Sequence, residues 1–211
     1  IGNYAGMDWT TASESVAIGY GAAENNTDQS RSVTIGYLAS NTGVALGNVA
    51  IGYQAGKAFT STSYENVVIG YNAAYQATAR NLTVMGRAAL STMVTGNNQT
   101  AIGHEALASF VSGTSNTAIG KSAGASFESG SVNVFIGEQA GFGNGTQTGV
   151  ADYNVFIGGY SGYDINTGAY NVGVGGFTLN NATTASLSIG IGYKAGEDVT
   201  TGTANVLIGG Y

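Results

Sequence analysis

The same pattern of apolar positions recurs at a nearly constant interval along this chain, once in each short repeat of the sequence. Each repeat has a run of β-branched residues, a glycine, and an alanine three positions later, as in "NVAIGYQAG" at residues 48–56. The spacing of this glycine is nearly constant, as the series Gly2, Gly19, Gly36, Gly52, Gly70, Gly86, Gly103, Gly120, Gly137, Gly158, Gly175, Gly192 and Gly209 shows. The period is too short for helical-pair repeats or propeller blades and predicts one turn of a β-solenoid per repeat.

Positions counted from this glycine predict which side chains face the core. The −1 position is Ile, Val or Met in every repeat, and the −3 position is Val, Thr or Ile. Residues two apart in a strand share a face, so we expect −1 and −3 to form the core and −2 to face outward. The +3 position is almost always Ala, which predicts a tight corner beginning at the glycine.

The rest of each repeat predicts a second corner and a second short strand. Pairs such as Thr95-Gly96 and Ser112-Gly113 mark the corner. A weaker apolar column at +7 predicts the inward residue of the second strand: Trp9, Phe59, Met93, Phe110, Phe127, Ile165 and Val199, broken at Asn26, Gly43 and Asn144. The −4 position is mostly Asn or Ser, which indicates either an amide ladder between coils or a simple preference for a turn.

The predicted fold is therefore all-β: one continuous parallel β-solenoid over residues 1–211 with about 17 residues per coil. Both ends of the sequence cut through the repeat, so we expect the parent chain to extend in both directions. The thin Ile and Val core of one rod favours association. Apolar side chains at −2 (Val68, Phe135, Phe156 and Leu207) are expected to form the seam between chains of a homotrimer.

The motif resembles two families of trimeric surface fibres. "SVAIG" at residues 15–19, "NTAIG" at 116–120 and "YQAG" at 53–56 resemble the head repeats of trimeric autotransporter adhesins and, more closely, the repeats of phage tail fibres. The adhesin repeat is typically shorter than the one in this chain, which favours the fibre. The resemblance implies a left-handed β-roll with three chains around one axis. The long interval from Gly137 to Gly158, "NLTVMG" at 81–86 and "SIGIGY" at 188–193 depart from the pattern and predict local irregularity.

Composition and residue inventory argue against most chemistry. With 35 Gly, no Cys, 9% charged residues and a net charge of −6, the chain lacks the basic surface that nucleic acid requires and has no thiolate metal site. No apolar run is long enough for a membrane helix. His104 is the only histidine and sits at the variable +1 position, which predicts a surface residue, and only Glu197 and Asp198 are adjacent acids. We expect no catalytic, cofactor or metal site.

These observations predict a structural and binding protein. The favoured interpretation is a homotrimeric tail-fibre segment on a phage virion, which positions or contributes to receptor binding at the host surface. One alternative is the head of a bacterial trimeric adhesin at the cell surface, and an alternative of another class is a polysaccharide-degrading tailspike.

Two places could contact a glycan or protein receptor on a host cell. Tyr20, Tyr37, Tyr53 and Tyr71 occupy the +1 position of four consecutive repeats and should stack as an aromatic strip. The long interval predicts an exposed loop over residues 143–153, with Asn144, Thr146 and Gln147 as candidate contacts. The alternative for both is scaffolding: stacked tyrosines stabilise one another, and a longer loop can be a tolerated insertion.

Overall fold

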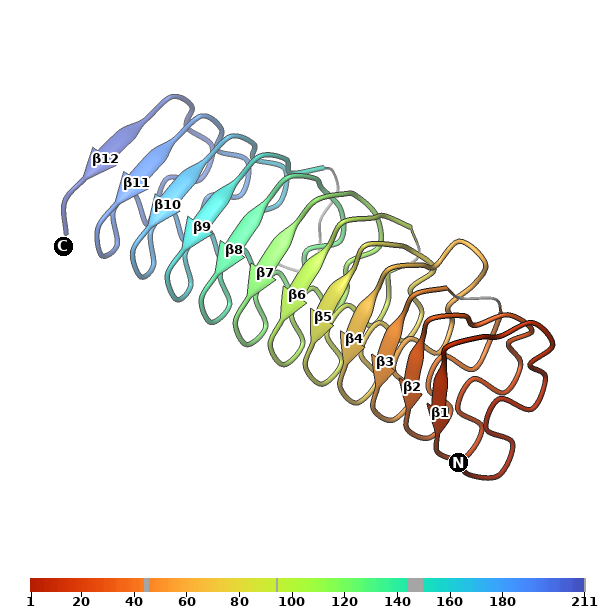
Figure 1. Cartoon of the computed structure of the whole chain (residues 1–211). Helices are drawn as coiled ribbons and strands as arrows, with labels where there is room; N and C mark the ends of the chain where they lie inside the picture. The colour runs from red at the N-terminus through yellow and green to blue at the C-terminus, as the bar shows by residue number, and fades with distance from the viewer. Residues whose placement is uncertain (44–45, 94, 144–149, 211) are drawn as a thin grey trace.

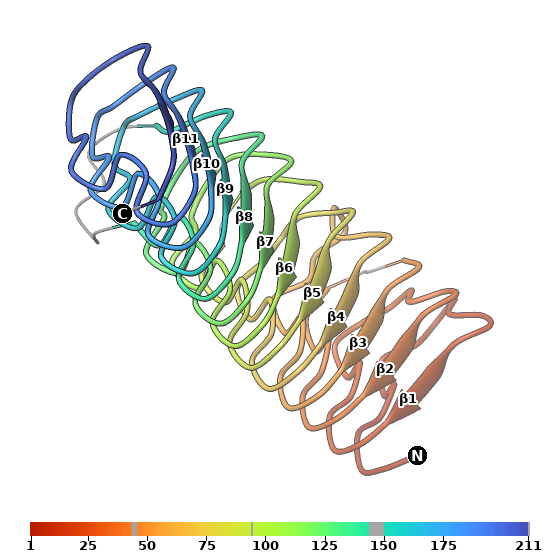
Figure 2. The same ribbon diagram turned by 90° about the vertical axis from the view of Figure 1, so that its left-hand side faces the viewer.

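The chain folds into a rod made of one stack of similar coils (Figure 1). The structure is a computed structural model and describes residues 1–43, 46–93, 95–143 and 150–210. Each coil contributes one strand, the strands lie side by side in chain order, and the two termini lie at opposite ends of the rod (Figures 1 and 2). The predicted parallel β-solenoid, with one coil per sequence repeat, is confirmed.

One parallel sheet of twelve strands runs the length of the described chain. The strands are β1 (Val16–Ile18), β2 (Val33–Ile35), β3 (Val49–Ile51), β4 (Val67–Ile69), β5 (Thr83–Met85), β6 (Thr100–Ile102), β7 (Thr117–Ile119), β8 (Val134–Ile136), β9 (Val155–Ile157), β10 (Val172–Val174), β11 (Ile189–Ile191) and β12 (Val206–Ile208). All neighbours pair in the same register, including β8 with β9 across the longest interval. The departures at residues 81–86 and 188–193 therefore do not disturb the sheet.

The sheet faces the opposite way from the prediction. In β2 to β11 the middle residue, at −2, is buried, while its −3 and −1 neighbours are half-buried or exposed. The expectation that −3 and −1 form the core was wrong. So was the expected seam at −2, because Val68, Phe135 and Phe156 are fully buried inside the rod and Leu207 packs against its core.

Two columns of compensating size fill the interior. Phe156 at −2 lies against Gly162 at +4, where a Cβ would come within 2.4 Å of the phenyl ring. One coil further on the sizes are exchanged, with Gly173 at −2 and a buried Leu179 at +4. Close packing explains this exchange, because the space between the two walls of a coil is fixed. The predicted +7 column completes the core, with fully buried Phe59, Met93, Phe110, Phe127 and Ile165.

The motif glycine is required by both conformation and space. Its φ lies between 118° and 145° in all thirteen repeats, and residues that carry a Cβ rarely adopt this backbone conformation. A Cβ on Gly103 would lie 2.3 Å from the carbonyl oxygen of Gly120 in the next coil. The alanines at +3 in the eight coils from Ala22 to Ala140, such as Ala106 and Ala123, are fully buried. The predicted tight corner is confirmed.

The second side of each coil is a series of turns and not a second strand. Residues at +2 and +4, such as Ala88 and Leu90, have φ values of 54° and 50°, so the chain curves where an extended strand was expected. Parallel pairing on this side is limited, among the described residues, to isolated bridges such as Thr95 with Ser112. Backbone hydrogen bonds still join successive coils here, as from Ser126 N to Phe142 O at 2.8 Å.

Of the two alternatives expected at −4, the asparagines form the amide ladder. Nδ2 of Asn154 donates to Oδ1 of Asn133 at 3.1 Å, and Nδ2 of Asn171 donates to Oδ1 of Asn154 at 3.0 Å. The same Nδ2 atom of Asn154 also donates across the coil to the carbonyl of Gly168 at 2.9 Å. These asparagines are fully buried, so the ladder satisfies backbone groups that water cannot reach.

Candidate functional site: an apolar sheet face and its two edges

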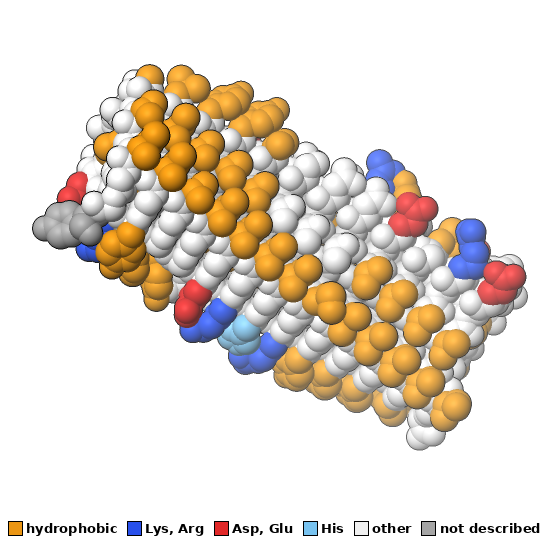
Figure 3. All heavy atoms as spheres, turned by 60° about the vertical axis from the view of Figure 1, so that its left-hand side comes forward, with side chains coloured by type: hydrophobic (Ala, Val, Ile, Leu, Met, Phe, Trp, Pro, Cys, Tyr) orange, Lys and Arg blue, Asp and Glu red, His pale blue; other side chains and the backbone are white. Residues whose placement is uncertain are grey.

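The outward face of the sheet carries an unbroken apolar row at −1, and its −3 row is apolar except at Thr83, Thr100 and Thr117. Figure 3 shows parallel rows of hydrophobic side chains following the solenoid axis. The face is roughly 50 Å long and about 10 Å wide, on the order of 500 Å². The largest apolar patches on soluble monomers cover about 300–600 Å² and are often functional, and this face is of that size. Its most exposed members are Val16, Ile18, Val67, Met85, Ile119, Ile157, Val174, Ile191, Val206 and Ile208.

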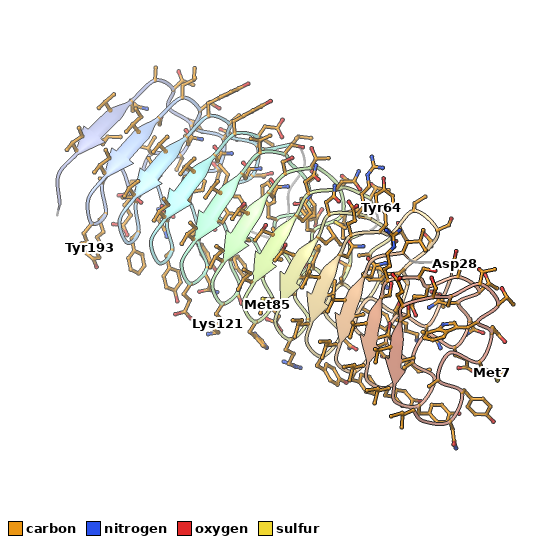
Figure 4. The ribbon with its side chains drawn as sticks, viewed as in Figure 1. Met7, Asp28, Tyr64, Met85, Lys121 and Tyr193 are labelled. Atoms are coloured by element: carbon orange, nitrogen blue, oxygen red, sulfur yellow. The ribbon has the colours of Figure 1, made fainter. Side chains whose placement is uncertain are left out.

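Two columns of side chains border this face. The −5 column precedes each strand and comprises Glu14, Arg31, Gly47, Glu65, Asn81, Asn98, Ser115, Val132, Tyr153, Tyr170, Leu187 and Ala204. The +1 column follows each strand and comprises Tyr20, Tyr37, Tyr53, Tyr71, Arg87, His104, Lys121, Glu138, Gly159, Gly176, Tyr193 and Gly210. In Figure 4, Lys121 and Tyr193 of the +1 column lie at one edge of the strands, and Tyr64, next to the −5 column, lies at the other.

The four tyrosines at +1 form the predicted stack. Ring centroids of Tyr20 and Tyr37, Tyr37 and Tyr53, and Tyr53 and Tyr71 are 5.5, 5.1 and 4.8 Å apart, with interplanar angles of 13°, 8° and 8°. The rings are 40–50% exposed, but each covers the face of its neighbour. A ligand beside the strip therefore meets ring edges and hydroxyl groups, so sugar stacking on a ring face is restricted to the end of the row.

Ionisable side chains continue the +1 column. Nη1 of Arg87 lies 2.8 Å from Nε2 of His104, and in this hydrogen bond the guanidinium is the donor because arginine has no acceptor. Lys121 donates to Glu138 at 2.9 Å, and this hydrogen bond raises the pKa of Lys121 above its ordinary value. The His104 side chain is 40% exposed, and its Nδ1 lies 3.7 Å from the carboxylate of Glu105.

An apolar stretch of the −5 column was missed by the sequence analysis. Val132, Tyr153, Tyr170 and Leu187 occupy four consecutive coils and are all exposed. Tyr153 and Tyr170 stack with centroids 4.9 Å apart and an interplanar angle of 3°. Four large apolar side chains in one column were visible in the sequence. They widen the apolar face in the half of the rod where the +1 column carries glycine.

A second aromatic cluster, also missed, lies just beyond the glycines of the +1 column. Tyr160 and Phe177 stack at 4.9 Å, and Tyr163 stacks on Phe142 at 5.0 Å. These rings are half-buried and pack against one another. Asp164 belongs to the same segment, and partial burial of its carboxyl group raises its pKa above the ordinary value. Ring packing within the cluster accounts for these side chains.

The potential metal-ligating side chains of the described residues are dispersed along the rod. The part of the chain that the structure describes contains no group of three or more His, Asp or Glu that could hold a metal ion. Glu197 pairs with Lys194 at 3.1 Å, and Asp198 accepts from Asn181 at 3.1 Å, so the adjacent acids serve the scaffold. No helix among the described residues is long and apolar enough to cross a membrane.

A hollow of about 210 Å³ opens at Gly47 in the −5 column. Its walls are Arg31 and Glu65, which flank Gly47 in the neighbouring coils, with Leu46 and Tyr64. The other candidate contacts, Asn144, Thr146 and Gln147, lie outside the described residues.

Comparison with known proteins adds no relative. The chain matches no protein-family model, no curated protein and no solved structure.

Proposed function

We propose that this chain is a segment of a homotrimeric, left-handed β-solenoid fibre, and that the fibre belongs to a phage tail. The carrying observation is the apolar outward face, which continues from β1 to β12 without a charged residue at −3 or −1. Water-exposed Val and Ile over this length are stabilised when a second surface covers them. Association with further copies of the chain covers the face of every copy at once.

The seam of the proposed trimer differs from the one expected from the sequence. Side chains at −2 fill each rod, so those at −3 and −1 are the ones available to pack around a common axis. Each chain then has two hydrophobic layers: an interior of its own and a shared one between chains. This arrangement remedies the thin core that a single rod of this length provides.

The work of such a segment is to hold a receptor-binding region away from the particle. Parallel strand pairing, the turn hydrogen bonds and the asparagine ladder all run from coil to coil. Bending the rod stretches these bonds on one side in every coil, which makes the segment stiff along its axis. A stiff spacer transmits position and force between the tip and the tail.

Labelling tests the proposal at the level of the particle. Antibodies raised against the purified segment should decorate the tail fibres of the phage in electron micrographs, and antibody fragments should slow its attachment to host cells. Labelling confined to the bacterial cell surface would instead support an adhesin head. Release of shortened glycans from capsule by the purified segment would support a tailspike and overturn the spacer role.

A further inference from the structure

Glycines at which a Cβ would find open space lie at the two edges of the sheet face. Most described glycines would place a Cβ under 3.0 Å from another atom, as Gly103 does. Besides Gly209, whose coil is the last described, four others would meet nothing nearer than 3.6 Å: Gly47, Gly159, Gly176 and Gly210. The last three also lack the positive φ that favours glycine. All four belong to the −5 or the +1 column.

In three coils the two columns compensate each other in size, whereas Leu187 and Tyr193 are both large and Ala204 and Gly210 are both small. Gly47 at −5 shares its coil with Tyr53 at +1, and Gly159 at +1 shares its coil with Tyr153 at −5. The coil of Gly176 likewise carries Tyr170. Charges also avoid each other: Glu14, Arg31 and Glu65 at −5 share coils with tyrosines, and Arg87, Lys121 and Glu138 at +1 share coils with uncharged residues.

This compensation has no cause within one chain. The −5 and +1 side chains of a coil are six positions apart with a strand between them, which places them roughly 20 Å apart. They lie at opposite edges of the strand ladder (Figure 4). Inside the rod, compensation such as Phe156 with Gly162 reflects direct contact. The same pattern between edges that do not touch points to contact between different chains.

We infer that the −5 edge of one chain packs against the +1 edge of a second copy, in register, coil by coil. The inference rests on the proposed parallel assembly. In a parallel assembly with rotational symmetry about an axis along the rods, each chain faces its sheet toward the axis. The −5 edge of one chain then lies beside the +1 edge of its neighbour. Because a rotation does not shift a chain along the axis, each coil lies beside the same coil of the neighbouring chain. Face and edges together measure roughly 20 by 50 Å, on the order of 1,000 Å² per chain, enough for a stable interface.

The partner's side chains match the surfaces they meet. Tyr53 of one copy enters the hollow over Gly47 of the next, between Arg31 and Glu65. In the other half of the rod, Tyr153 and Tyr170 cover the flat backbone at Gly159 and Gly176. Tyr37 meets Arg31, a pairing that adds a cation–π contact. The tyrosine strip thus belongs to the seam between chains in place of the expected receptor contact.

Disulfide trapping tests this pairing, because the chain has no cysteine of its own. In the full segment carrying Tyr170→Cys with Gly176→Cys, oxidation should link each copy to the next and give a covalent trimer on a non-reducing gel. The two sulfurs of one chain are too far apart to pair internally. Neither single substitution should give a covalent product. An offset pair, Tyr153→Cys with Tyr193→Cys, lies two coils apart, about 10 Å along the axis, and should not link.

The outcomes separate this inference from the proposed function. An assembly of trimer mass in which the matched pair stays unlinked overturns the edge pairing and leaves the trimer standing. A covalent dimer from Tyr170→Cys alone means antiparallel packing and overturns it as well. A monomeric mass for the unmodified segment overturns both. Gly159→Leu supplies a second measurement: its Cβ meets nothing nearer than 3.9 Å within the chain, so the fold should persist, while trimer dissociation should become at least about tenfold easier.

Discussion

Replacement of one ladder asparagine tests how much the buried amides contribute. In Asn154→Ala the carbonyl of Gly168 loses its donor, which is Nδ2 at 2.9 Å, and the backbone N–H of Asn171 loses its acceptor, which is Oδ1 at 3.0 Å. Asn133 Oδ1 keeps the backbone N–H of residue 154 at 2.9 Å. Two buried backbone groups therefore remain without partners, and each such group costs about 1–3 kcal/mol. We expect a loss of about 2–6 kcal/mol in the free energy of unfolding.

A graded series makes the assay specific. Asn154→Ser should lose less than the alanine variant, because Ser188 at the same position of the ladder accepts from Asn205 Nδ2 at 3.3 Å. The matched control is Asn181→Ala, which removes only a surface hydrogen bond to Asp198 and should change stability by under about 0.5 kcal/mol. Urea denaturation gives the free energies, and hydrogen exchange at the amide of Asn171 reports the local loss. If Asn154→Ala matches the control in both measurements, the ladder does not stabilise the rod.

Three further predictions concern the corners, the core and the sheet face. Gly103→Ala should cost about 3 kcal/mol or more in thermal or urea unfolding, because the methyl group meets the Gly120 carbonyl at 2.3 Å at a φ of 136°; Gly210→Ala, with open space, is the control and should be near neutral. Phe127→Ala should cost about 3–5 kcal/mol by urea denaturation, because the fully buried ring packs on Phe110 and Phe135; a loss under about 1 kcal/mol would contradict the described core. Val155→Lys with Val172→Lys should leave the circular dichroism of the rod intact and release single chains, whereas Thr200→Lys with Thr201→Lys on the far side should not; an assembled lysine variant would exclude the sheet face from the interface.

The repeat and its corners could be predicted from the sequence, but the facing of the strand could not. Glycine at one fixed position and alanine at +3 have single steric explanations, and both were confirmed at Gly103 and Ala106. A strand such as Val134–Ile136 is apolar at all three positions, so alternation does not separate inside from outside. Uniform Val and Ile columns predict the core at −3 and −1. The interior is in fact the column that varies in size.

The missed signal was compensation between columns. Phe156 with Gly162 and Gly173 with Leu179 show that −2 and +4 share a confined space, and both pairs can be read from the aligned repeats. Uniform columns of β-branched residues, such as those at −3 and −1, are typical of a flat sheet face that packs against another flat face. The second side of the coil was missed for another reason: left-handed backbone conformations at residues such as Ala88 and Leu90 leave no mark in composition.

The mass of the purified segment in solution tests the central claim most directly. Sedimentation equilibrium at micromolar concentration should give three times the chain mass of 21.2 kDa, with no dependence on loading concentration. A single species of 21.2 kDa would contradict the account, because the exposed Val and Ile face would then be stable in water with nothing covering it.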